Sequence, residues 1–67
     1  MPRYFITVEI EYSNDDLLQY GKVRIKREFE KPQSTLELPL QLCIHDFYSK
    51  MCGYCINNIR VLAFSLN

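Results

Sequence analysis

The first thirty residues alternate between apolar and polar side chains, as strands with one buried face do. From residue 3 to residue 12 the apolar positions are Tyr4, Ile6, Val8, Ile10 and Tyr12. β-Branched and aromatic residues in strict period two predict a half-buried strand. The next four residues, 13–16, are polar residues that hydrogen-bond their own backbone, so a turn is expected there.

A second strand is predicted from about Leu18 to Glu30. Its apolar phase is Val23, Ile25 and Phe29, and its polar phase is Lys22, Arg24, Lys26, Glu28 and Glu30. Gly21 predicts a bulge or bend, because glycine inside a strand packs nothing. Arg27 interrupts the apolar phase and is expected near the strand end, in water. If the two strands form a hairpin, Glu9 and Glu11 face the basic residues of the second strand.

A helix is predicted from Pro39 to Ile56, after a short extended piece at residues 35–38. Proline cannot donate to a strand ladder but suits the first turn of a helix. At about 100° per residue one apolar side forms. It consists of Leu40, Ile44, Phe47, Met51 and Cys55. Asn57 and Asn58 are expected to end the helix.

The third strand, from Ile59 to Leu66, is apolar on both faces. Ile59, Val61 and Ala63 form one face, and Leu62, Phe64 and Leu66 form the other. One predicted helix covers one face, so the second face needs another cover. The element order predicts an α+β fold: a small ββαβ domain over residues 1–67, with a three-stranded, mainly antiparallel sheet and one helix packed on one face.

Composition narrows the class of protein. With 67 residues, the chain buries a marginal core, which favours help from a partner subunit. Eight basic and eight acidic residues cancel, so no global field steers the protein to nucleic acid or membranes. No apolar stretch approaches the length of a membrane helix. Three cysteines, an odd number, argue against a secreted disulfide framework and favour the cytoplasm.

Three cysteines and the single histidine lie close together in the sequence, as in a zinc site. The candidate ligands are Cys43, His45, Cys52 and Cys55. On a continuous helix, however, Cys43 and Cys52 point in nearly opposite directions, and no second segment supplies ligands. The C-x-x-C pair also lies at the helix C-terminus, where the dipole disfavours a thiolate. We therefore expect packing rather than metal or redox chemistry, with zinc as the alternative, and no cofactor.

His45, Asp46 and Ser49 contain the side-chain types of a catalytic triad. Neighbouring helical residues point about 100° apart, and the chain has no glycine-rich oxyanion loop. We expect a solvated polar face, no catalytic residues and no enzymatic activity.

Two binding hypotheses follow. The leading one is a small protein-interaction module that binds and modulates or inhibits another protein, as phage-type inhibitors of host defence do, and that forms a homodimer. Its predicted contact residues are Phe5, Leu62, Phe64 and Leu66, an apolar patch left by the third strand. The alternative is a nucleic-acid module. It uses the basic strand residues Lys22, Arg24, Lys26 and Arg27, although Glu9 and Glu11 dilute their field.

Overall fold

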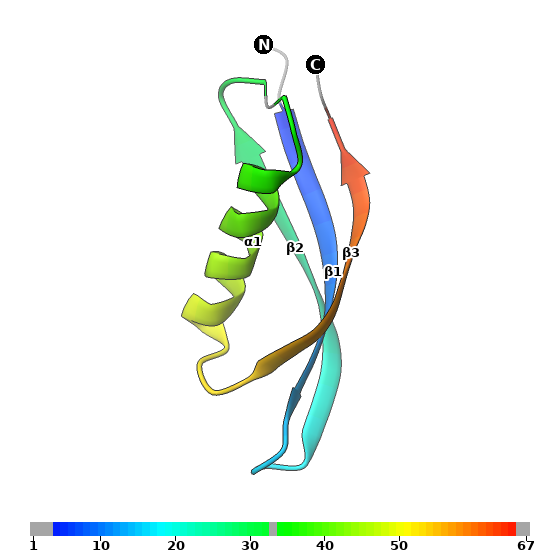
Figure 1. Cartoon of the computed structure of the whole chain (residues 1–67), viewed down its shortest axis with the longest axis vertical. Helices are drawn as coiled ribbons and strands as arrows, with labels where there is room; N and C mark the ends of the chain where they lie inside the picture. Colours follow the sequence, from blue (N-terminus) through cyan, green and yellow to red (C-terminus); the bar gives the residue numbers. More distant parts are fainter. Residues whose placement is uncertain (1–3, 33, 66–67) are drawn as a thin grey trace.

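The computed structural model describes residues 4–32 and 34–65. Its elements are strand β1 (Tyr4–Asn14), strand β2 (Gln19–Phe29), helix α1 (Glu37–Lys50) and strand β3 (Cys55–Phe64), in that order (Figure 1). The predicted ββαβ arrangement is confirmed, with an antiparallel sheet and one helix on one face.

The sheet has the strand order β2-β1-β3, so β1 is central and both other strands are edges. β1 and β2 pair without interruption from Tyr4 opposite Phe29 to Asn14 opposite Gln19. The molecule measures 44 × 19 × 18 Å, and the β1–β2 hairpin continues past the end of α1 (Figure 1).

The core lies between β1 and α1. Ile6, Val8 and Ile10 of β1 and Cys43 and Phe47 of α1 are fully buried. They point to the same layer because alternate residues of a strand and residues i, i+4 of a helix share a face. Half-buried apolar residues of β2 and β3 pack around them.

The helix is shorter than predicted and begins earlier. It starts at Glu37, so the expected extended piece at residues 35–38 is wrong, and Pro39 lies within the first turn. It ends at Lys50 instead of Ile56, because Met51 leaves the helical region (φ −119°, ψ 55°) and Gly53 adopts a positive φ of 90°. Glycine accepts this conformation without a steric penalty.

The early end of the helix moves the start of β3 from Ile59 to Cys55. β3 also does not keep strict alternation. Its register against β1 shifts between Thr7 and Val8 and between Glu11 and Tyr12, which leaves Leu62 and Asn57 as extra residues. Each extra residue inverts the phase of those that follow.

Gly21 does not mark a bulge, because the β1–β2 register runs through it unbroken opposite Tyr12. A side chain at Gly21 meets the Tyr12 ring instead: a Cβ there lies 2.8 Å from Oη and 3.0 Å from Cζ. The predicted bulge is therefore wrong, and glycine at this position makes room for an aromatic side chain.

Candidate interaction surfaces

The face of the sheet opposite α1, called the outer face, carries a ladder of ion pairs. Glu9 of the central strand lies between Arg24 of β2 (3.7 Å) and Arg60 of β3 (3.1 Å). Glu11 lies 3.5 Å from Lys22. The cross-strand pairing expected from the sequence is confirmed. Acidic side chains of the middle strand lie between basic ones of the edges, and Glu28 of β2 lies 3.6 Å from Lys26, so the positive charge is largely compensated along this face.

Arg27 turns to the other face of the sheet. It pairs with Ile6 in the β1–β2 register, and its guanidinium hydrogen-bonds Asp46 of α1. The hydrogen bond and charge of Asp46 raise the pKa of Arg27 above its ordinary value. As expected, Arg27 lies near the strand end and its side chain is 40% exposed, but the sequence pattern did not predict its ion pair with Asp46. The four basic residues of the nucleic-acid hypothesis therefore do not share one surface: Lys22, Arg24 and Lys26 lie on the outer face, and Arg27 lies on the helix side.

The predicted partner-binding residues do not form one patch either. Phe5 lies on the outer face, where Lys26 Nζ is 4.9 Å from the ring centroid. Phe64 pairs with buried Ile6 and packs against the core, so the prediction that it lies outside is wrong. Leu62 lies at the bulge with 37% of its surface exposed. Leu66 lies outside the described residues.

The side of β3 that faces the core is apolar and only partly covered. α1 packs over β2 and β1 and, in the part of the chain that the structure describes, its backbone makes no close contact with β3. Ile59, Val61 and Phe64 pack against the core cluster but are only half-buried. Figure 1 shows the later part of β3 at the side of the sheet away from α1, whereas its start follows the turn below the end of the helix. These three residues and Leu62, the exposed bulge residue of the same edge strand, are together called the β3 surface.

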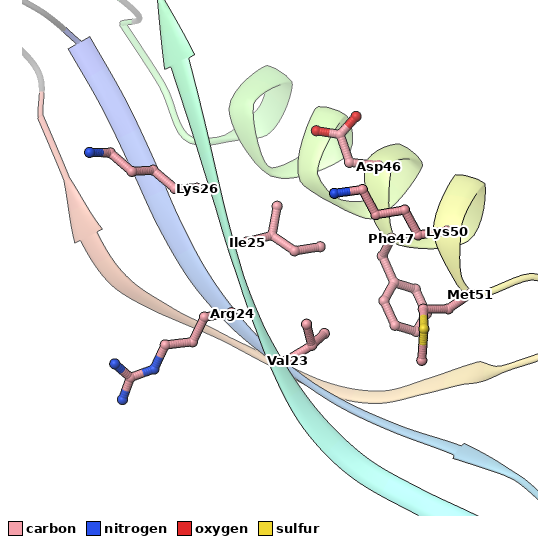
Figure 2. Close-up of a pocket in the computed structure, with 8 residues that line it drawn as sticks. All are labelled: Val23, Arg24, Ile25, Lys26, Asp46, Phe47, Lys50 and Met51. Atoms are coloured by element: carbon pink, nitrogen blue, oxygen red, sulfur yellow. The ribbon is translucent and has the colours of Figure 1, made fainter.

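A second apolar surface lies between α1 and β2. This shallow groove has a volume of about 210 Å³. Its apolar lining comes from Val23, Ile25, Phe47 and Met51, with Asp46 and Lys50 above them (Figure 2). The side chains of Arg24 and Lys26 point away from the helix, to the other face of the sheet. The groove holds few polar groups that would orient a small ligand.

The candidate zinc ligands lie in three parts of the structure: helix α1, the turn that follows it and strand β3. Cys43 is buried in the core, whereas His45, Cys52 and Cys55 are exposed. Because the helix ends at Lys50, Cys52 lies in the following turn and Cys55 begins β3. Among residues 4–32 and 34–65, no three His, Cys, Asp or Glu side chains are grouped to hold a metal ion. Desolvation, reinforced by Asp46, raises the pKa of the Cys43 thiol.

The three residues with triad chemistry have other contacts. Asp46 accepts two hydrogen bonds from Arg27. Ser49 Oγ donates to the backbone oxygen of His45 at 2.9 Å, the usual local bond of a helical serine. These contacts place Asp46 against β2 and Ser49 along the helix backbone.

The sequence predictions missed the tip of the β1–β2 hairpin. Leu17, Leu18 and Tyr20 are the most exposed large apolar side chains of the described residues. The signal was present in the sequence: two leucines follow Asp15 and Asp16 at a predicted turn, where polar residues are usual.

No protein family, curated protein or solved structure matches the chain. Within the described residues, no helix has the length and apolar character needed to cross a membrane.

Proposed function

We propose that this chain is a non-enzymatic protein-interaction module that binds another protein and modulates or inhibits it, and that it forms a homodimer through the β3 surface. The observation that carries the proposal is an edge strand whose apolar inward side the single helix leaves partly uncovered. Apolar surface of this kind usually marks an interaction site.

The exposed area supports the need for a partner. A folded monomer of this mass is expected to expose about 4,500 Å², whereas this chain of 8.0 kDa exposes 5079 Å². The surplus of about 600 Å² approaches the roughly 800 Å² that each partner buries in a standard interface.

The two edges of the sheet differ in their suitability for pairing. β2 presents an alternating series of charged residues, which protects an edge strand against association. In β3 the only charged residue is Arg60. An antiparallel strand pairs with its own copy across a two-fold axis, so a second copy of this chain is the occupant that we assign to the β3 surface.

Two cysteines support a cytoplasmic location. Cys52 and Cys55 are exposed and unpaired. Exposed free thiols persist where the thiol pool is kept reduced.

Sedimentation and native mass spectrometry test the dimer. We expect the wild-type chain to have twice the mass of 8.0 kDa, and Leu62→Lys to shift it to the monomer. Leu38→Lys, at an exposed leucine of α1, is the matched control and leaves the dimer intact. A wild-type chain that stays monomeric at high concentration, or a Leu62→Lys variant that dimerises as well as wild type, contradicts the assignment.

A further inference from the structure

The tip of the β1–β2 hairpin exposes an apolar cluster at one end of the molecule. Leu17 is 59% exposed, and Leu18 and Tyr20 are each 87% exposed. The turn at residues 15–18 projects past α1 (Figure 1), whereas Tyr20, at the start of β2, lines a hollow with Asn57 of β3. Such a cluster contributes nothing to the core and increases the risk of nonspecific association.

The backbone at the tip is strained. Leu18 has a φ of 53°, in the left-handed region. Glycine or asparagine adopts this conformation readily, whereas the side chain of leucine makes it unfavourable. Strained residues are concentrated at functional sites, because folding alone selects against them. Leu18 thus combines an unfavourable backbone conformation with nearly complete exposure.

Hydrogen bonds hold this tip in a defined shape. Leu17 N–H donates to Asn14 Oδ1 at 3.1 Å, and Leu18 N–H donates to the Asp15 oxygen at 3.3 Å. The base is attached to the turn after α1, where Asn14 Nδ2 donates to the Gly53 oxygen at 3.1 Å.

A second bond at the base joins Tyr54 Oη to Gln19 Oε1 across the same junction. An apolar group held in place in advance loses little conformational entropy on binding. The tip therefore has the properties of a preorganised anchor.

We propose that the hairpin tip inserts into an apolar pocket of a partner protein whose rim carries lysine or arginine. Leu17, Leu18 and Tyr20 fill the pocket, and the exposed carboxylates of Asp15 and Asp16 face the basic rim. Acidic residues beside the leucines disfavour insertion into anionic membranes. The inference rests on the proposed function, binding to another protein, and assigns that binding to a surface separate from β3.

Affinity capture with the full-length chain tests the proposal. The wild-type chain, a tip variant (Leu17→Ser, Leu18→Asn, Tyr20→Ser) and a control (Leu36→Ser, Leu38→Ser, both exposed) are immobilised. Each is incubated with cell extract, and bound proteins are quantified by mass spectrometry. We expect a protein that wild type and control retain and that the tip variant loses.

Affinities for that purified protein then complete the test. We expect the tip substitutions to raise Kd by about 30-fold or more, as loss of anchor residues does, and Asp15→Lys with Asp16→Lys to weaken binding further by reversing the charge. Thermal unfolding checks the fold: Leu18→Asn raises the melting midpoint while it weakens binding. If Leu18 instead has a structural role, the melting midpoint of Leu18→Asn is lower than that of wild type.

Three results overturn the inference. A partner that binds the tip variant as tightly as wild type refutes the tip as the contact and leaves the proposed function standing. Tip-dependent flotation with phosphatidylcholine vesicles, without a captured protein, assigns the tip to lipid. A wild-type chain that captures no protein refutes the inference and the proposed partner binding together.

Discussion

Arg27 on β2 and Asp46 on α1 form the ion pair that joins the helix to the edge of the sheet. Arg27 Nη1 lies 2.8 Å from Asp46 Oδ1 and 2.7 Å from Oδ2. The pair lies on the helix side of the sheet. It gives Arg27, a charged residue in an otherwise apolar phase of β2, an acidic partner. The pair thereby links α1 to β2 beside the apolar contacts of the core.

We expect Asp46→Asn and Arg27→Gln each to lower the urea midpoint, and the double variant to lose less than the sum of the two, because both remove one interaction. Lys22→Gln, at an exposed cation on the outer face, is the matched control and changes the midpoint less. Strict additivity in the double-mutant cycle is the result that contradicts a coupled pair.

Phe47 is the central contact between the layers. Its ring is fully buried, with centroids 5.8 Å from Tyr12 and 5.3 Å from Tyr48. Phe47→Ala is expected to cost about 3–5 kcal/mol, enough to unfold a domain of this size. Tyr48→Ala, at a neighbouring exposed ring, is the control and should leave a cooperative transition. Circular dichroism during thermal unfolding measures both.

Glu9 is the most shielded carboxylate of the outer-face ladder, since its side chain is 13% exposed while that of Glu11 is 42% exposed. It contacts two guanidinium groups, whereas Glu11 contacts one ammonium group. We expect Glu9→Gln to lower the free energy of unfolding by about 1 kcal/mol and Glu11→Gln by about 0.3 kcal/mol. High salt should reduce the difference between the effects of these two substitutions on the free energy of unfolding. Equal effects of the two substitutions in denaturant titrations contradict the ladder.

Gly21 gives space to Tyr12, whose ring also lies 5.3 Å from Tyr54 and so has little freedom to move. Alanine in a strand ordinarily costs less backbone entropy than glycine, but Gly21→Ala here is expected to destabilise the fold by about 1 kcal/mol through overpacking. Tyr12→Leu in the same chain should relieve the clash. A more stable Gly21→Ala protein in urea titrations is the opposite outcome.

Cys43 is the one buried thiol, and burial raises its pKa. Iodoacetamide should label Cys52 and Cys55 rapidly and Cys43 only after unfolding, a difference that mass spectrometry resolves. Rapid labelling of all three cysteines in the native protein contradicts this burial.

The raised pKa of Cys43 also sets a pH dependence. The unfolded chain loses the thiol proton first, near the ordinary pKa of 9.0. The contribution of the protonated Cys43 thiol to the free energy of unfolding is therefore complete below that pH. It is lost as the pH rises through the pKa of the thiol in the folded protein. Stability should fall at alkaline pH, less so in Cys43→Ala than in the Cys52→Ser, Cys55→Ser control. If the stability of these variants changes with pH in parallel, the result contradicts a link between Cys43 ionisation and stability.

Local pattern predicted the hairpin and its charge pairs well. In residues 4–14 the alternation alone specifies which side chains are buried, and it places Glu9 and Glu11 on the face that meets the basic residues of β2; the register decides that Glu9 meets Arg24. The helix end was predicted six residues too late, because an apolar helical stripe continues through Met51 and Cys55 although Gly53 breaks the backbone. Periodicity reports which side chains suit a helix and does not report where the backbone turns.

The sequence by itself determined the element types, their order and the inward face of β1, because period and residue type act within one segment. Only the tertiary structure decided that β1 is central, that Phe64 turns inward after a bulge at Leu62 and that Arg27 meets Asp46. Each of these depends on a neighbouring segment's register. A shift of one residue in that register exchanges the two faces of a strand, and no pattern within the strand records it.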